Sequence, residues 1–412
     1  MDVGVGLPST IATATGPDVT GWAAEADRLG FASLGTLDRV VYGNHDTIPT
    51  LAAAAAVTSR VRLTTAILIA PYRGNGTLLA KQLATVDSIS GGRLTVGVAV
   101  GGRPDDYAAT GTDFEGRGAV FDAQLAEMRA VWDGASRGTA GRVGPAPVQP
   151  GGPPLLFGGT GRAAVRRTVS MGAGWIAGGG GAATFEQGAG QVRAAWDEAG
   201  RPGAPRLAAL GYFALGPDAS TAASDYLHDY YGFLGDYAAQ VVAGALTEED
   251  AVRQAIAQFT DAGCDELILF PCSTAADQLS RLADVARSSA RSRVRVVPTG
   301  TYTREASRTG RRPRVVSPKS TPVRSHKIKA GLVSMSASDR CRGRSGFAAG
   351  DQLAAGVVRV DPVAAQPGAA HHAGQRALRI RGDRVAVVQP GHVHHERVVR
   401  GEVGIDPTQA ER

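Results

Sequence analysis

Cysteine is scarce in this chain, with three residues in 412, at Cys264, Cys272 and Cys341. Because they show no C-x-x-C or C-x-H spacing, they exclude a disulfide framework and a cysteine-based zinc site, and we expect no bound metal. Long apolar runs are also missing, since no uncharged stretch reaches the roughly 18 residues of a membrane-spanning helix. The N-terminus has no basic segment ahead of an apolar run. We therefore expect a cytoplasmic protein that is neither exported nor membrane-embedded.

Aromatic and acidic residues are rare in the C-terminal part. Residues 287–412 contain 24 Lys and Arg against 9 Asp and Glu, and only Tyr302 and Phe347 of the 23 aromatic residues. Residues 1–286 have the opposite balance, 20 against 29, so the net charge of +6 combines −9 with +15. A segment so poor in aromatic side chains has little from which to build a core. The composition predicts a globular domain over residues 1–286 and a basic, weakly ordered tail over residues 287–412.

The tail leaves two interpretations open. Its positive charge would attract nucleic acid, with a cluster at Arg308, Arg311, Arg312, Arg314 and Lys319. Stacking aromatics and a recognisable binding fold are missing, so no specific nucleic-acid recognition is predicted. The abrupt change of composition is also what an altered reading frame in a GC-rich gene would produce. The His-rich stretches HHAG and HVHHE are interpreted as unstructured rather than as metal sites.

Strand-like and helix-like patterns alternate along residues 1–286. Strands are expected at residues 3–7, 32–37, 61–69, 94–100, 155–157, 175–177, 207–215 and 266–270. Alternation of this kind is typical of a parallel sheet covered by helices, an α/β architecture. About eight strand-helix units over some 285 residues match a (β/α)8 TIM barrel, and an open doubly wound sheet is the alternative.

Residues 49–111 contain a helix, Asp87, the turn Ser-Ile-Ser-Gly-Gly-Arg93 and a glycine-rich strand, in that order. With AEADRLGF, FEGRGAVFDAQLAEMRAVW, PPLLFGGTGRAAVRR and AGCDELILF, this order resembles the bacterial-luciferase-like flavin-dependent oxidoreductases, which use FMN or the deazaflavin F420. The resemblance covers most of residues 1–286. It implies a monooxygenase that uses reduced FMN and O2 on a small organic substrate, with a flavin reductase as partner and a homodimer as the usual assembly. An F420-dependent hydride-transfer enzyme and a non-catalytic flavin-binding protein are the alternatives.

Glycines follow two neighbouring predicted strands. The first group opens a helix, and the second is an unbroken run from Gly178 to Gly181. Backbone N–H groups without adjacent side chains can approach a phosphate, and a helix N-terminus favours an anion. The resemblance assigns the cofactor phosphate to Gly158, Gly159, Thr160, Gly178 and Gly179, and two ordinary flexible loops are the alternative. A dinucleotide fingerprint is rejected because no acidic residue lies between Arg162 and Thr184.

The resemblance places the cofactor ring at the third and fourth strands. In that family the third strand ends in a bulge, often with a non-proline cis peptide bond, and the matching residues are Ala66 and Ile67. The fourth strand brings Val100, Gly101 and Gly102 to the same end, where small residues leave room for a planar ring. Arg103 then supplies positive charge near the reduced flavin.

Candidate reactive residues follow the second and third strands. F420-dependent relatives carry Asp-His and luciferases a His-containing pair where this chain has Asp38-Arg39, and its nearest imidazole is His45. We name His45, Asp38 and Arg39 as candidate catalytic residues, because imidazole titrates near neutrality and Asp38 could orient Arg39 or a substrate. A solvent-exposed histidine and a loop salt bridge are the alternatives. The expected substrate contacts are Tyr72, Arg73, His228 and Tyr231.

Three further features are assigned mainly structural roles. Residues 225–237 are rich in aromatics and suit either a packed helix or a lid over the substrate, and packing is favoured. Asp87 and Arg93 are predicted to form a charge pair that fixes a glycine turn on the stability face of the barrel. Cys272 has no neighbouring base in the sequence, so a nucleophilic thiol is not predicted.

Overall fold

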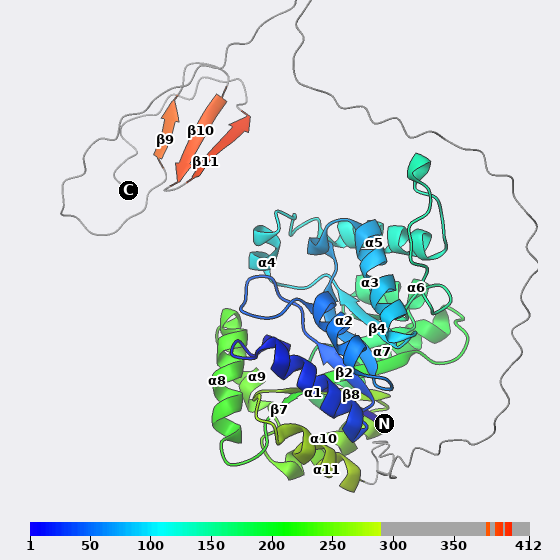
Figure 1. Ribbon diagram of the computed structural model, residues 1–412, viewed down its shortest axis with the longest axis vertical. Coiled ribbons are helices and arrows are strands. Elements are labelled where there is room, and N and C mark those ends of the chain that lie inside the picture. Colours follow the sequence, from blue (N-terminus) through cyan, green and yellow to red (C-terminus); the bar gives the residue numbers. More distant parts are fainter. Residues whose placement is uncertain (290–375, 380–383, 390–391, 398–412) are drawn as a thin grey trace, which may run out of the picture. The chain divides into compact units, whose positions relative to one another are not determined.

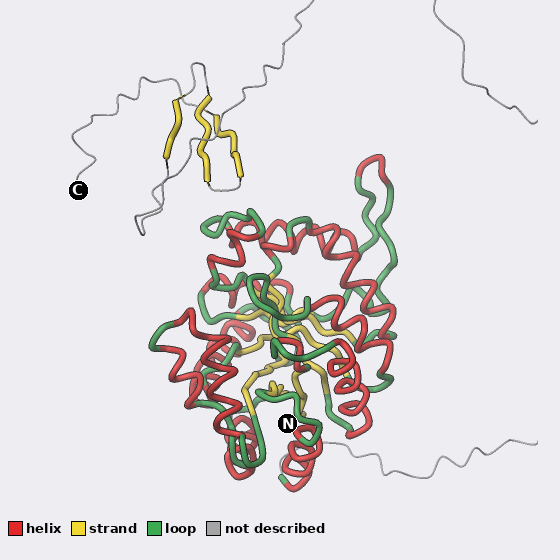
Figure 2. The backbone as a smooth tube through the Cα atoms, turned by 60° about the vertical axis from the view of Figure 1, so that its left-hand side comes forward, coloured by secondary structure: helices red, strands yellow, loops and turns green. Residues whose placement is uncertain are grey.

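The computed structural model describes residues 1–289 and three short segments, 376–379, 384–389 and 392–397. Residues 1–289 form a closed barrel in which eight parallel strands follow one another in sequence order, with helices outside (Figure 1). Figure 2 shows the strands enclosed by helices. The predicted (β/α)8 barrel is therefore confirmed, and the open doubly wound sheet is wrong. None of the described helices combines the length and the apolar character that crossing a membrane requires.

The barrel strands are β1 (Asp2–Gly6), β2 (Ser33–Thr36), β3 (Arg62–Ile69), β4 (Leu94–Ala99), β5 (Leu155–Gly158), β6 (Gly174–Ala177), β7 (Arg206–Phe213) and β8 (Glu266–Pro271). The helices are α1 (Gly16–Leu29), α2 (Thr47–Val57), α3 (Gly76–Ser90), α4 (Pro104–Ala109), α5 (Arg117–Trp132), α6 (Arg162–Met171), α7 (Gly181–Glu198), α8 (Ala219–Tyr231), α9 (Tyr237–Ala243), α10 (Glu249–Asp261) and α11 (Gln278–Ser288). Short 3₁₀ turns are η1 (Pro8–Thr10), η2 (Pro71–Arg73), η3 (Gly138–Ala140) and η4 (Gly232–Leu234).

Local sequence signals set the first helices. Thr15 and Asp18 form a capping box at the start of α1, and Gly30 ends the helix in the left-handed conformation with φ 86°. Asp46 and Asn75 cap α2 and α3 through hydrogen bonds to backbone N–H groups. These caps determine the residue at which each of the three helices begins.

The turn after α3 differs from its prediction in one respect. Gly91 and Gly92 have positive φ, as a glycine turn requires, but the expected Asp87–Arg93 pair is wrong. The buried Asp87 carboxylate accepts from the backbone N–H groups of Val148 and Gln149, and Arg93 donates to carbonyls at the end of α2. Each charge finds several backbone dipoles that the closed barrel brings within reach, so each is satisfied without the other.

A buried ion cluster lies at the amino ends of the strands. Glu266 at the start of β8 pairs with Arg62 of β3 and Arg206 of β7, and Arg62 also pairs with Asp2 of β1. The carboxylate of Glu266 is almost completely buried. Burial opposes its ionisation, but Arg62 and Arg206 outweigh burial and lower the pKa of Glu266. This end of the barrel is therefore closed by charge pairing, and the opposite end is left for a ligand.

Apart from residues 287–289 at the end of α11, the described part of the tail is a three-stranded antiparallel sheet in the order β11-β10-β9. Its strands are β9 (Arg376–Arg379), β10 (Arg384–Gln389) and β11 (His392–Arg397). The stretch HVHHE, expected to be unstructured, lies within β11. The rest of the tail, including the basic cluster at 308–319 and the stretch HHAG, lies outside the described residues.

Candidate active site

The third strand carries the predicted bulge at the carboxyl end of the barrel, which we call the mouth. The register of β3 against β4 shifts between Thr65 and Leu68, and the Ala66–Ile67 peptide bond is cis. Ile67 is half-buried, and its Cδ1 atom would stand only 2.7 Å from a Cβ placed on Gly158. The side chain of Ile67 therefore lies against the end of β5.

Val100, Gly101 and Gly102 follow β4 at the mouth, as predicted. The carbonyl of Val100 accepts a hydrogen bond of 2.5 Å from the hydroxyl of Tyr107. Gly101 has φ +68°, a conformation that favours glycine, and a Cβ there would stand 2.8 Å from Cγ2 of Ile69. Both the backbone conformation and the lack of space therefore require glycine at this position. The chain after β4 thus runs close against β3 and bears no side chain at that point.

Two glycine loops lie beside each other at the ends of β5 and β6, which are neighbours in the barrel. Gly159 has φ +100°, and its carbonyl accepts from the indole N–H of Trp175 at 2.8 Å. Gly179, Gly180 and Gly181 also have positive φ. Positive φ values in successive residues occur in the backbone concavities that bind anions.

The helices that follow these loops begin without a side-chain cap. The N-cap residues Gly161 of α6 and Gly180 of α7 form no side-chain cap, a feature shared with every described α-helix except α1, α2 and α3. A Cβ on Gly161, Gly179 or Gly181 would meet no atom within 4 Å. Grooves of about 530 and 430 Å³ start next to these loops but run along the outer helices, between α7 and α10 and between α6 and α7, so neither groove is the mouth itself. Free N–H groups beside open space fit a phosphate.

Asp38 lies at the end of β2 with its carboxylate inaccessible to solvent. It accepts from the backbone N–H of Ile69 at 2.9 Å and pairs with the guanidinium of Arg73, which also pairs with Asp46 at 2.6 Å. Burial raises the pKa of Asp38, and Arg73 opposes that shift. Asp38 thus forms a salt bridge between loops, one of the alternatives, and its partner is Arg73 of η2 rather than Arg39.

Arg39 has its own partners, on α4. Its guanidinium lies 3.1 Å from Asp105 and 3.4 Å from Asp106. The buried carboxylate of Asp106 also accepts from the backbone N–H groups of Val40 and Val41, at 3.0 and 2.7 Å. Asp106 therefore holds the loop after β2 in place from the loop after β4.

Tyr72 and Tyr107 meet edge to face, with ring centroids 5.6 Å apart. The hydroxyl of Tyr107 is bonded to Val100, whereas the buried hydroxyl of Tyr72 forms no close hydrogen bond with a described residue and interacts with the carboxylate of Asp38. Burial, and then the neighbouring carboxylate of Asp38, raise the pKa of Tyr72. Tyr72 therefore keeps a protonated hydroxyl, and this hydroxyl interacts with the carboxylate of Asp38.

Five aromatic residues cover the mouth, and we call them the aromatic cover: Tyr42, Tyr226, Tyr230, Tyr231 and Phe233. Four of them belong to α8 and η4 in the insertion after β7, and Tyr42 comes from the loop after β2. The rings of Tyr42 and Tyr230 are 5.1 Å apart, and the hydroxyl of Tyr42 donates to Asp229. Tyr231 shares a 2.6 Å hydrogen bond with Tyr212 inside the barrel. The packing expected for residues 225–237 is thus observed for α8, and it spans the mouth.

The two histidines of the barrel domain lie apart. His45 follows the loop after β2, half-buried, with its Nδ1 atom buried and without a partner among the described residues. His228 lies on the exposed face of α8, where Nδ1 is 2.9 Å from the carbonyl of Ser224. Cys272 is buried at the end of β8, and burial raises the pKa of its thiol to about 12, which disfavours the thiolate form that a nucleophile needs.

The structure brings most of the candidate residues to one end of the barrel. Residues after β2, β3 and β4 share one network, and the glycine loops lie after β5 and β6, whereas His228 is exposed on α8 and contacts only Ser224 in the described hydrogen bonds. Sequence reasoning missed Asp106 and Tyr42. The sequence Pro-Asp-Asp-Tyr after Arg103, a helix start rich in acid, was the available signal for Asp106.

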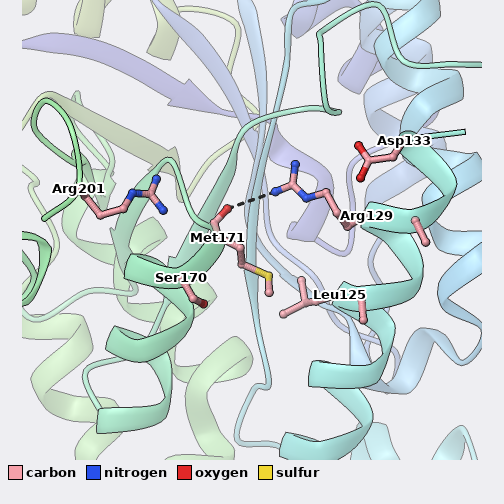
Figure 3. Close-up of a pocket in the computed structure, with 8 residues that line it drawn as sticks. Leu125, Arg129, Asp133, Ser170, Met171 and Arg201 are labelled. Atoms are coloured by element: carbon pink, nitrogen blue, oxygen red, sulfur yellow. Dashed lines mark hydrogen bonds between the residues drawn. The ribbon is translucent and has the colours of Figure 1, made fainter. Parts of the chain in front are cut away.

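A cavity of about 660 Å³ lies elsewhere, between the last turns of α5 and α6 (Figure 3). Its two arginines are engaged with backbone carbonyls. Arg129 donates to Gly151 and Met171, and Arg201 donates to Val169 and Gly172. These hydrogen bonds tie loops to helix ends, so the cavity is not the centre of the candidate site.

The fold and the mouth define a (β/α)8-barrel protein with a ligand site at the carboxyl ends of its strands. A family model described as luciferase-like monooxygenase matches residues 1–292, and the chain belongs to that family. Two uncharacterized proteins of Mycobacterium tuberculosis are 34% and 32% identical over 174 and 164 residues. These matches cover 39% and 38% of this chain and 59% and 56% of the relatives, so the chain spans less than two thirds of their length.

Solved structures with both kinds of cofactor share the fold. The monooxygenase RslO1 from Streptomyces bottropensis has a TM-score of 0.56 at 23% identity, over 70% of this chain and 98% of that one. An F420-dependent secondary alcohol dehydrogenase in complex with an F420-acetone adduct has a TM-score of 0.58 at 18% sequence identity. The match covers 69% of this chain and 97% of that one. The oxygenating constituent of 3,6-diketocamphane monooxygenase from Pseudomonas putida, in complex with FMN, has a TM-score of 0.54 at 15% sequence identity. The match covers 70% of this chain and 97% of that one. At these identities the likeness shows the fold alone.

Proposed function

We propose that this protein is a cytoplasmic, homodimeric monooxygenase that uses reduced FMN and O2 to oxygenate a small organic substrate. A separate flavin reductase supplies the reduced cofactor. One observation carries the proposal: the bulge of β3 and the two glycine loops before α6 and α7 lie at the same end of the barrel. The side chain of Ile67 extends from the bulge to Gly158. Family membership supports the same class of chemistry.

In this proposal the phosphate of FMN is held by Gly158, Gly159, Thr160, Gly178 and Gly179, and the ring is supported by Ala66, Ile67, Val100, Gly101 and Gly102. When bound, FMN supplies the electrons that activate O2. The chain supports the ring on Ile67, binds the phosphate with backbone N–H groups, and excludes water with the aromatic cover. The hydroxyl of Tyr72 donates a hydrogen bond to a reacting oxygen, and Arg73 is fixed by Asp38.

An F420-dependent hydride-transfer enzyme is the second candidate. It is favoured by Asp38, which stands where F420-dependent relatives carry the acid of an Asp-His pair, and the chain departs from that pattern at Arg39. A flavin-binding protein without turnover would keep the glycine loops but would not need the buried Tyr72 hydroxyl beside Asp38.

Anaerobic titration of the full chain with FMN, reduced FMN and F420 separates these candidates. We expect reduced FMN to bind and, with a flavin reductase present, a substrate to raise oxygen uptake above the uncoupled rate. Tight F420 binding with hydride exchange and no oxygen uptake would reverse the order. Folded protein that binds none of the three in any redox state would exclude the whole proposal.

A further inference from the structure

Three arginines lie at the mouth, but they differ in how their charge is balanced. Arg39 and Arg73 are each paired with two carboxylates. Arg103, in the loop after β4, forms no ion pair with any residue in the part of the chain that the structure describes. Its Nη2 atom donates to the carbonyl of Tyr230 at 3.2 Å, and its Nη1 atom is buried with no hydrogen-bond partner among those residues.

Aromatic rings surround the guanidinium of Arg103. Its central carbon lies 3.5 Å from the ring centroid of Phe233, 5.0 Å from that of Tyr230 and 5.9 Å from that of Tyr231. Such contacts stabilise a cation on the faces of the rings but do not neutralise it. Burial lowers the pKa of Arg103 and the charge of Arg39 adds to that effect, whereas Tyr230, Tyr231 and Asp106 oppose it. A half-buried cation of this kind is stabilised strongly when an anion completes its set of hydrogen bonds.

The position of Arg103 separates it from the expected phosphate site. The phosphate loops follow β5 and β6, whereas Arg103 follows β4 and touches the insertion after β7. Its contacts therefore cross the mouth and belong to the aromatic cover. A substrate bound beneath that cover would meet Arg103 together with the rings of Tyr230 and Tyr231.

We propose that Arg103 determines substrate specificity and that the substrate is a planar aromatic compound bearing a carboxylate. This inference rests on the proposed function and adds the class of its substrate. The guanidinium edge that carries Nη1 binds the carboxylate, because two N–H groups of a guanidinium match the two oxygens. The rings of the aromatic cover contact the flat face of the substrate by offset or edge-to-face stacking. Phe233 is 47% exposed, so its ring also remains open to contact from solvent.

Naphthalene-2-carboxylate and its neutral counterpart naphthalene-2-methanol test the inference as probes of equal size and shape. Their dissociation constants are measured by calorimetry on the full chain and on the Arg103→Gln and Arg103→Lys variants. Arg129→Gln, which changes an arginine of the distant cavity, is the matched control. The affinity of every variant for FMN, reduced FMN and F420 is measured in parallel, and circular dichroism checks folding.

We expect the wild type to bind the carboxylate roughly tenfold or more tightly than the alcohol, and Arg103→Gln to remove that preference. Arg103→Lys is expected to retain part of the preference for the carboxylate over the alcohol, and Arg129→Gln is expected to retain all of that preference. Equal loss of both probes in Arg103→Gln, or weaker cofactor binding instead, would assign Arg103 to packing or to the cofactor and overturn the inference. No preference in a wild type that binds cofactor would overturn it while leaving the proposed function intact.

Discussion

The side chain of Ile67 lies against Gly158, so the bulge of one strand fills the space that a side chain on another strand would need. A Cβ at position 158 would stand 2.7 Å from Cδ1 of Ile67 and 3.2 Å from the Cβ of Ala99. Only a residue without a side chain lets the end of β5 approach the bulge this closely. The proposed ring support and the proposed phosphate loop are thereby coupled through one van der Waals contact.

Gly158→Ala is therefore expected to displace Ile67 and to weaken binding of FMN or F420 by roughly tenfold. Overpacking of this kind costs about 1–3 kcal/mol of stability, so the barrel should remain folded. Fluorescence titration and thermal melting measure the two effects. Gly190→Ala is the control, because a Cβ at that exposed position in α7 meets nothing within 4 Å. Unchanged cofactor affinity in Gly158→Ala would contradict the coupling.

Asp105 and Asp106 are neighbours in sequence with different expected effects on stability. Asp106→Asn removes a buried charge that pairs with Arg39 and accepts from two backbone N–H groups, so we expect a loss of about 3 kcal/mol. Asp105 is 42% exposed, so Asp105→Asn should cost less than about 1 kcal/mol. Urea unfolding gives both values, and hydrogen exchange should quicken at Val40 and Val41 in Asp106→Asn alone. Equal losses in both variants would show that Asp106 does not hold the loop.

Tyr72→Phe and Tyr107→Phe remove hydroxyl groups from two touching rings. Because the hydroxyl of Tyr72 forms no close hydrogen bond and interacts only with the neighbouring carboxylate of Asp38, its removal should leave stability nearly unchanged. Tyr107→Phe breaks a hydrogen bond to Val100 and should cost about 1 kcal/mol. If Tyr72 contacts the reactants, kcat should fall in Tyr72→Phe by more than tenfold at equal stability. A Tyr72→Phe enzyme with normal kcat would exclude that contact.

Glu266→Gln is expected to destabilise the barrel by about 3 kcal/mol near neutral pH, because it leaves Arg62 and Arg206 without their shared buried partner. The folded-state pKa of Glu266 lies below its ordinary value of 4.5. The stabilisation from the ionised carboxylate is therefore complete above about pH 4.5 and is lost as pH falls through the folded-state pKa. The difference in the free energy of unfolding between wild type and Glu266→Gln should therefore become smaller in acid. Glu249→Gln, in an exposed pair with Arg253, is the control. A gap that widens in acid would contradict this sign.

The barrel was predictable because its signals are local. Caps such as Thr15, glycines such as Gly30 and the alternation of apolar patterns act within a few residues. The bulge at Ala66 and Ile67 was predictable only through resemblance, since nothing in their side chains marks a cis bond. The network at the mouth was not predictable, because Asp38 meets Arg73 and Asp106 meets Val40 only after the strands between them have paired. The predicted ion pair between Asp87 and Arg93 was wrong for the same reason. The two residues are close in sequence, but the closed barrel brings backbone groups near each of them, and each charge binds those groups instead.

The pairing of β1 with β8 has a consequence for how the chain is made. Asp2 of the first strand lies opposite Glu266 of the last, so the contact that closes the ring joins residues at opposite ends of the domain. During synthesis, one edge of β1 has no native neighbour until β8 has left the ribosome, and an open edge is prone to wrong pairing. Closure of so distant a contact is also slow, because the intervening loop entropy must be lost first. Protection of a nascent strand edge is therefore a requirement that this topology places on the cell.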